Sequence, residues 1–301
     1  MQATVLGAHI AAAAALILLS TEVVMAKEIE EKLERELPLK PGGKIELSHV
    51  TGRLRLSPSD GDKLIVRGTK RCGADSAEEA TRELKSVSVE FDASPSKISI
   101  STRYGTESMW EKLKKLFTGQ AMARVSIDLD LQVPPGAQVE LKTVSGDLEA
   151  HGLKGEFEAK SVSGQMRLSD LQGEVSLESV SGAIQATGLA GAVEFRTVSG
   201  AVTADRVGGG ELEAKSVSGD LLFHVVAGGW QGARLETVSG DMVLSLPAGS
   251  SAGVEFRSVS GKATVPPQAV AGSKGRSWKL GDGEPSVRVK SVSGDFSLKV
   301  E

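Results

Sequence analysis

Cysteine and aromatic residues are scarce in this chain of 301 residues. Cys72 is the only cysteine, so no disulfide can form within the chain. Lys70 and Arg71 precede it, but their charge is a weak sign of a reactive thiol, and we expect Cys72 to be a small buried residue. Aromatic residues make up 4% of the chain although 40% is hydrophobic. A thin core of Val, Leu, Ile and Ala is typical of stacked repeats rather than of a compact globule.

The chain also lacks an excess of charge of one sign. Its 35 basic and 39 acidic residues give a net charge of −4, which excludes the basic footprint of a nucleic-acid-binding protein. Proline is low at 10 residues while glycine reaches 35. Together with the hydrophobic content, this composition indicates many tight turns rather than disorder.

The first 26 residues have the pattern of an export signal. A run of ten apolar residues over 10–19 is followed by Val24-Met25-Ala26, a small-residue cleavage pattern. We therefore expect a signal peptide over 1–26, and ten residues are too few for a membrane-spanning helix. Residues 1–9 contain no Lys or Arg, so an uncleaved anchor is the alternative. No cysteine lies near the cleavage site, which excludes a lipoprotein linkage.

The strongest signal is a repeated Val-(Ser/Thr)-Gly unit. From Gly146 onward its glycines are separated by 18, 18, 18, 19, 21, 21 and 33 residues. The longest insertion, over 266–284, is rich in Gly, Pro and charge, as expected of a surface loop. A period near 18 residues predicts a solenoid. The glycines of the unit are Gly52, Gly146, Gly164, Gly182, Gly200, Gly219, Gly240, Gly261 and Gly294.

Each unit contains two short apolar–polar alternations, one on each side of the glycine. Around Gly146, the apolar positions are Val139 and Leu141 before it and Leu148 and Ala150 after it. The same four positions are apolar in every later unit, which predicts two strands per unit, each with one buried face. Each strand should pair in parallel with its equivalents about 4.8 Å above and below. The fold class is therefore an all-β, single-chain parallel β-solenoid of flattened coils, roughly seven of them over a rod of about 34 Å.

Polar positions of the unit repeat as well. Acids predominate six positions before the glycine and bases four positions before it, which predicts an interleaved charge array on one outer face. A Ser/Thr column three positions before the glycine, beginning with Thr143 and Ser161, could stack as a hydroxyl ladder. We expect the Ser, Gly and Asp of the unit to turn the chain rather than to bind a ligand.

Residues 27–135 repeat less regularly than the solenoid proper, 136–301. Here the composition predicts a helix over 28–36 and a second over 74–85, capped by Asp75 or Ser76. An insertion at 104–122 is expected to be a helix packed on the solenoid, with contact to a membrane or partner as the alternative. Strands are expected over 44–47, 53–56, 63–68, 87–91, 97–102 and 124–133. Apolar residues on one face of the inserted helix are Trp110, Leu113, Leu116 and Phe117.

No arrangement of residues predicts a catalytic, cofactor or metal site. The histidines lie far apart in the repeat, and no nucleophile motif or phosphate loop is present. Asp147, Asp220, Asp241 and Asp295 follow corner glycines, but the calcium-binding nonapeptide pattern is missing. The aliphatic residue at every sixth position that acyltransferase solenoids require is missing too. The four histidines are His9, His49, His151 and His224.

Three motifs carry a resemblance to a known family. They are Leu-x-Leu-x-Pro-Gly-Gly at 37–43, Val-Pro-Pro-Gly at 133–136, and the recurring (Ser/Thr)-Val-Ser-Gly-Asp. A Leu-Gly-Asp-Gly loop at 280–283 precedes the last repeat. The chain over 36–301 resembles the bacterial "putative adhesin" family of unknown function. The resemblance implies a repeat fold and supplies no functional residues.

The leading hypothesis is an exported, non-enzymatic, adhesin-like binding or scaffolding module of the bacterial cell envelope. Its partner would be an envelope polymer or protein, in the periplasm, at the cell surface or outside the cell, and not a nucleic acid. One alternative is a self-assembling structural protein that resembles the bactofilins. A second is a β-helix enzyme acting on carbohydrate, for which Asp170 or Asp205 would be the candidate acids.

Overall fold

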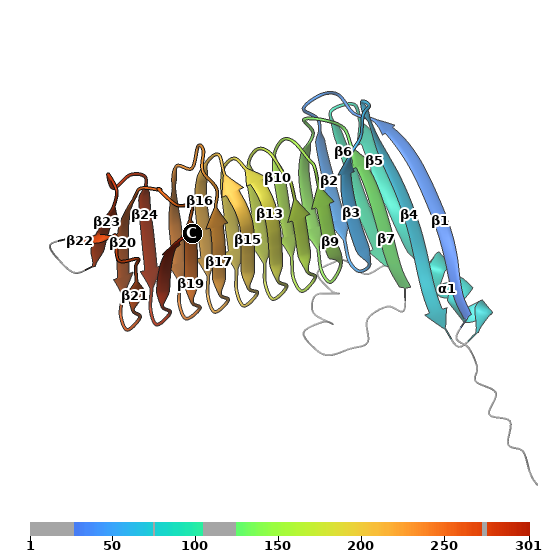
Figure 1. Ribbon diagram of the computed structural model, residues 1–301. Helices are drawn as coiled ribbons and strands as arrows, with labels where there is room; N and C mark the ends of the chain where they lie inside the picture. The colour runs from blue at the N-terminus through green and yellow to red at the C-terminus, as the bar shows by residue number, and fades with distance from the viewer. Residues whose placement is uncertain (1–26, 75, 105–124, 273–275) are drawn as a thin grey trace, which may run out of the picture.

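The computed structural model describes residues 27–74, 76–104, 125–272 and 276–301. In this part of the chain, two long sheets run along a rod, as Figure 1 shows. The all-β parallel solenoid expected from the repeat is confirmed. The predicted signal peptide over 1–26 and residues 105–122 of the predicted insertion lie outside the described residues.

Each sheet extends over the whole length of the rod. Sheet A has the order β1 (Lys27–Pro38), β4 (Lys63–Ala74), β7 (Val125–Val133), β3 (Arg53–Pro58), β9 (Asp147–His151), β11 (Met166–Ser169), β13 (Ile184–Ala190), β15 (Val202–Gly208), β17 (Leu221–Val225), β19 (Met242–Leu246), β25 (Phe296–Val300), β21 (Ala263–Thr264). Sheet B has the order β22 (Val270–Ala271), β23 (Ser277–Leu280), β20 (Ala252–Ser258), β24 (Ser286–Ser291), β18 (Gly232–Thr237), β16 (Glu211–Ser216), β14 (Val193–Thr197), β12 (Val175–Ser179), β10 (Phe157–Ser161), β8 (Gln138–Thr143), β2 (Lys44–His49), β6 (Lys97–Tyr104), β5 (Val87–Ser94).

Each repeat contributes one strand to each sheet, so the two-strand coil is confirmed. Phe157 of β10, for example, pairs in parallel with Val139 on one side and Val175 on the other. The predicted apolar columns point between the sheets and are buried, except at the C-terminal end, where Ala263 and Val265 are half-buried. The core is therefore a thin apolar layer enclosed by two sheets.

Corner glycines stack because neighbouring backbones come too close for a side chain. A Cβ atom on Gly182 would lie 2.0 Å from the carbonyl oxygen of Gly164, the glycine of the neighbouring coil. A second glycine ladder runs along the opposite turn edge. There Gly173 has φ +127°, and its Cβ would lie 2.2 Å from the oxygen of Gly155. The first ladder is required by close approach, and the second by close approach together with a left-handed backbone.

The predicted hydroxyl ladder is wrong. With the exception of Ser291, the Ser and Thr side chains three positions before the corner glycine bond within their own turn instead of to one another. Thr143 accepts from the backbone N–H of Gly146 at 3.1 Å, and Ser179 donates to the carbonyl oxygen of Gly182 at 2.7 Å. The hydroxyl thus supplies a local partner for a buried polar group of the turn, which stacking along the rod would leave unpaired.

The helix predicted over 28–36 is a strand, β1, which pairs antiparallel with β4. Its apolar residues Ile29, Leu33 and Leu37 are four apart, a spacing that fits one helix face and also one face of a strand. In the structure they pack on the core. The acids between them meet bases across the strand pair, for example Glu34 with Arg67 at 2.8 Å. Cross-strand partners decide the conformation that local composition left ambiguous.

The helix predicted over 74–85 begins later, because β4 continues to Ala74. It is α1 (Ala77–Lys85), and the Ser76 hydroxyl caps it by accepting from the backbone N–H of Glu79 at 3.1 Å. Ala80 and Leu84 are buried where α1 packs on β4 and β1, at the N-terminal end of the rod in Figure 1.

The last repeat lies out of chain order. Strand β24 is inserted between β18 and β20, and β25 between β19 and β21. The chain passes beyond this position, forms β20 and β21, and then returns to fill the gap. The segment over 266–284, expected to be a loop, contains β22 and β23, whose antiparallel pairing next to β20 closes this end of sheet B. Near the other end, β6 and β7 similarly lie outside β2 and β3.

His49 occupies the position that Ser or Thr holds in the later corners, and it is completely buried. Burial lowers the pKa of His49 to about 4, against the opposing influence of the Asp128 carboxylate. The unfolded chain therefore binds a proton more readily than the folded chain between pH 6.5 and about 4. The free energy of unfolding is therefore highest above pH 6.5 and decreases as the pH falls from 6.5 to about 4.

We expect the free energy of unfolding to fall by about 2 kcal/mol between pH 7 and pH 5 because His49 must become protonated. Urea titrations at the two pH values should show this loss in the wild-type chain, and the His49→Thr variant should lack it. His151→Thr, which changes an exposed histidine, is the control and should retain the loss. An identical pH dependence in His49→Thr would contradict the assignment.

Candidate binding surface

A row of exposed valines follows the corner edge of the solenoid. We call it the valine ridge. Its members stand two positions before the corner glycine, and five of them in adjacent coils are between 41% and 48% exposed. Val162 at one end is half-buried, and Val259 at the other end is 84% exposed. In spatial order, the ridge consists of Val162, Val180, Val198, Val217, Val238, Val292 and Val259.

Every other member of the repeated corner has a structural task. The serine that follows Val198 donates both its backbone N–H and its hydroxyl to the carbonyl oxygen of Val180, at 2.9 and 3.2 Å. The glycine allows the close approach described above. Where the next residue is Asp, its carboxylate accepts the backbone N–H of the equivalent residue one coil away, as Asp220 does from Asp241 at 2.9 Å. The exposed valine side chain is the one member of the corner without such a task, and sequence reasoning missed it.

The missed signal was visible in the repeat. The valine is as regular as the core columns, yet it lies at the corner, between the two alternating segments whose apolar positions point inward. A regular apolar residue outside both alternating segments indicates a column that the core does not require, although Val50 and Val144, its first two members, are buried.

Basic side chains flank the valine ridge on sheet B. Two residues before each of the seven ridge valines stands a base in five coils and an acid, Glu178 or Glu236, in the other two. A sixth base, Lys142, stands in the same position before Val144, which is buried and lies outside the ridge. Many of these bases pair with an acid two residues earlier on the same strand, for example Lys215 with Glu213 at 2.6 Å. This arrangement is the interleaved array expected from the sequence. The flanking bases are Lys142, Lys160, Arg196, Lys215, Lys290 and Arg257.

The inserted last repeat concentrates positive charge near the C-terminal end of sheet B. Chain order would place Glu255 between Arg234 and Arg288, whereas the actual order makes the two arginines direct neighbours in adjacent strands. Like charges opposite one another are unfavourable in a sheet. Within the described residues, neither arginine has an ion-pair partner, and neither does Arg276. We call Arg234, Arg276 and Arg288, together with the nearby Lys215, Arg257 and Lys290, the basic patch.

An open groove lies where the basic patch meets the valine ridge. It has a volume of about 560 Å³ and crosses β16, β18, β24 and β20 at their corner ends. Val238, Val292 and Val259 line it, as do four bases of the patch and a single acid, Glu236, which pairs with Lys290 at 2.8 Å. The hydroxyl of Ser291 is buried in its lining and, within the described residues, has no hydrogen-bond partner.

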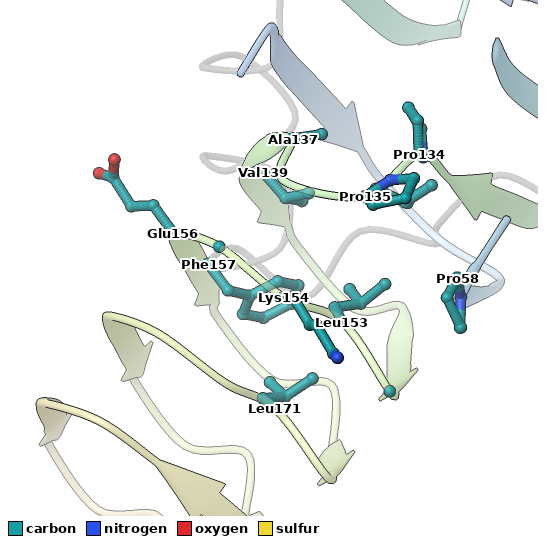
Figure 2. Close-up of a pocket in the computed structure, with 13 residues that line it drawn as sticks. Pro58, Pro134, Pro135, Ala137, Val139, Leu153, Lys154, Glu156, Phe157 and Leu171 are labelled. Atoms are coloured by element: carbon teal, nitrogen blue, oxygen red, sulfur yellow. The ribbon is translucent and has the colours of Figure 1, made fainter. Parts of the chain in front are cut away.

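A smaller, enclosed pocket lies at the opposite turn edge, where residues 134–136 lead into the regular repeat. Figure 2 shows prolines, including Pro58, on one side and Leu153, Phe157 and Leu171 on the other. Its volume of about 190 Å³ is below the usual range of ligand pockets, roughly 300–1,000 Å³, and its lining is mainly apolar. We interpret it as a packing gap at the junction formed by residues 134–136.

The residues with chemical potential do not converge on one site. His224 lies 3.8 Å from Asp205, and Asp170 lies 3.5 Å from Arg206, the residue that follows Asp205 in β15. Cys72 is buried, as expected. Over 27–74, 76–104, 125–272 and 276–301, no cluster of His, Cys, Asp and Glu could hold a metal ion.

Three solved structures resemble the chain over most of its length. A "putative lipid binding protein" from Parabacteroides distasonis ATCC 8503 is 13% identical, with a TM-score of 0.54 over 89% of this chain and 97% of its own. A "putative adhesin" from the same organism is 10% identical (TM-score 0.44; 90% and 97% covered). Another from Bacteroides fragilis NCTC 9343 is 12% identical (TM-score 0.39; 90% and 97% covered). At these identities, the likeness concerns the fold alone.

A search of curated proteins finds no match to the chain. In the part of the chain that the structure describes, no helix is long and apolar enough to cross a membrane. The profile of one family matches residues 98–299, about two thirds of the sequence and most of the stacked coils. The match confirms the resemblance first indicated by the Val-Ser-Gly-Asp repeats, and the chain belongs to the Toastrack DUF4097 family.

Proposed function

We propose that this protein is an exported, non-enzymatic binding or scaffolding module of the bacterial cell envelope, and that the valine ridge is its contact surface. The observation that carries the proposal is the exposure of one regular apolar column: Val50 and Val144 at its start are buried in the core, whereas its members from Val180 to Val259 are exposed. With about 4.8 Å between coils, the seven valines of the ridge extend over about 29 Å. Contiguous apolar surface of this kind is typical of interaction sites.

Export is supported by the signal-like pattern of residues 1–26. The names of the structurally similar proteins, adhesins and a lipid binding protein, are in keeping with a binding role in the envelope. Each name applies to the protein that carries it. For this chain, the names are a reason to test binding.

The two alternative functions have less support. Self-assembly by continuation of the parallel stack would require a parallel coil at both ends of the rod, but the outermost strands of sheet B, β5 and β22, pair antiparallel with their neighbours. For a carbohydrate-active enzyme, a groove with converging acids would be required. One groove, on the outer face of sheet A, has a single acid, Glu149, and this carboxylate pairs with Arg55 at 2.9 Å. A second groove, at the C-terminal end, has Glu255 and Asp282, but Glu255 pairs with Arg257 at 2.6 Å and Asp282 accepts the backbone N–H of Glu284 at 3.1 Å.

A pull-down from detergent-solubilised envelope extract tests the valine ridge. We expect the double variant Val217→Ser/Val238→Ser to retain its partner at least about tenfold less well than the wild type, because two half-exposed valines no longer bury apolar surface on binding. The matched control is Val226→Ser/Val270→Ser, which removes two exposed valines outside the ridge.

Equal losses in the two double variants would show that the ridge is not the contact surface. Cell fractionation tests the location separately. The wild-type chain should appear in the periplasmic, surface or extracellular fraction, and its confinement to the cytosol would refute the export proposal.

A further inference from the structure

We propose that the partner of the valine ridge is the surface of a membrane that contains anionic lipids. The inference rests on the proposed function and names its partner. The rod would lie along the bilayer with its corner edge down, so that the valines enter the interface and the basic patch faces the lipid headgroups.

The shape of the surface favours a broad partner over a single small molecule. The groove of about 560 Å³ is open along its length, and its valines reach exposures of 46% to 84%. A binding site normally encloses most of the surface of a small ligand, and this groove is too open to do so. A straight edge of apolar side chains in consecutive coils instead matches a flat, continuous partner. A lipid surface offers such a partner to every coil at once.

The charge around the ridge favours an anionic surface. The chain as a whole carries a net charge of −4, yet on sheet B five of the seven residues that flank the ridge valines are basic. On the sheet A side of the ridge, the carboxylates of Asp220, Asp241 and Asp295 accept backbone N–H groups of neighbouring coils. At the C-terminal end, Arg234, Arg276 and Arg288 form no short ion pair within the described residues. Glu213 and Glu255 lie opposite Arg234 and Arg288 on the neighbouring strands, but each of these acids forms its ion pair with a base on its own strand, Lys215 or Arg257. Basic residues next to a membrane-facing apolar surface are attracted to anionic headgroups.

The unpaired hydroxyl of Ser291 is an independent observation at the same place. In other corners the equivalent hydroxyl bonds to its own glycine, as Ser216 does when it accepts from the N–H of Gly219 at 2.7 Å. Ser291 is 8% exposed, and its oxygen has no partner in the described structure. Among the Ser and Thr hydroxyls of the described corners, the one without a hydrogen-bond partner therefore lies beneath the basic groove.

Vesicle flotation with the full chain tests the inference. The probes are vesicles of neutral phosphatidylcholine and vesicles in which about a third of the lipid is phosphatidylglycerol. We expect tight, salt-sensitive binding to the anionic vesicles only. Arg234→Gln/Arg276→Gln/Arg288→Gln should weaken this binding on the order of 100-fold, since each base near a membrane surface contributes about fivefold. Val217→Ser/Val238→Ser should weaken it at least about tenfold.

The matched control for charge is Lys154→Gln/Arg167→Gln/Lys299→Gln, which removes three exposed bases away from the valine ridge, none with an ion-pair partner in the described residues. It should bind anionic vesicles within about threefold of the wild type, because distant charges are screened. Residues 1–26 are the same in all variants. If the arginine and valine variants both bind like the wild type, residues outside the ridge carry the binding and the inference is wrong.

Two further outcomes separate this inference from the proposed function. If a lipid-free envelope extract still supplies a partner that the Val217→Ser/Val238→Ser variant loses, while vesicles do not bind, the proposed function stands and the lipid partner is refuted. If soluble dextran sulfate binds through the arginines and removal of the valines has no effect on any binding, the partner is an acidic polymer rather than a membrane.

Discussion

Replacing Gly182 with Ala is expected to lower the free energy of unfolding by about 3 kcal/mol, near the upper end for an overpacked site. The added Cβ would lie 2.0 Å from the carbonyl oxygen of Gly164, which is backbone and cannot rotate aside. One coil would have to move away from the next, and this movement would stretch the hydrogen bonds around the corner, such as that from Ser181 N–H to the Val162 oxygen at 2.9 Å. Urea denaturation measures the loss.

Gly61→Ala is the matched control. Its Cβ would have no atom within 4 Å, and its φ lies outside the left-handed region, so we expect a change within about 0.5 kcal/mol. If Gly182→Ala were as stable as Gly61→Ala, the close stacking of the corners would be wrong. If instead Gly182→Ala does not fold at all, the same substitution at Gly261, in the last coil of the rod, tests the contact under milder conditions.

Removal of residues 283–301 is expected to destabilise strands β18 to β21, because β24 and β25 are inserted between them. Without them, β18 and β19 lose one neighbour each, and β20 and β21 lose their link to the rest of the rod. Hydrogen exchange should show lost protection in β18–β21 together. A solenoid stacked in chain order would lose protection in β20 and β21 alone.

A point variant tests the same arrangement in the full-length chain. Phe296 of β25 is 1% exposed and stacks on Phe256 of β20, with 6.0 Å between the ring centroids. Phe296→Ala should cost about 3–5 kcal/mol, and the protection of β20 should decrease with it. Loss of protection that leaves β20 untouched would contradict the inserted order.

Much of the fold could be predicted because its pattern is local. Buried columns two residues apart, as at Val139 and Leu141, predict a strand with one inward face wherever it lies in space. The prediction failed where local signals were ambiguous. The four-residue spacing of Ile29, Leu33 and Leu37 fits a helix as well as a strand, and only the partner strand β4 resolves it.

The candidate surface was less predictable than the fold. Sequence reasoning assigned the Ser, Gly and Asp of the corner to turning the chain. In the structure, Ser and Asp instead form hydrogen bonds to the neighbouring coil, and Gly allows the two coils to approach closely. The valine beside them escaped notice because an apolar residue in a repeat is readily taken for part of the motif. Its exposure becomes visible only when the corner is built and the core is found to be full without it.

By itself, the sequence determined the two-strand coil, its inward columns and its stacked corner glycines, because each depends on residues that are close along the chain. Only the tertiary structure decided which coils are neighbours. Every repeat offers nearly the same strand edges and apolar faces, so the repeat pattern cannot distinguish stacking in chain order from insertion of the last unit. That choice brings Arg288 next to Arg234 and places Val292 between Val238 and Val259. The Val-Ser-Gly repeat thus determines the edge of the rod, while long-range packing determines where charge gathers along it.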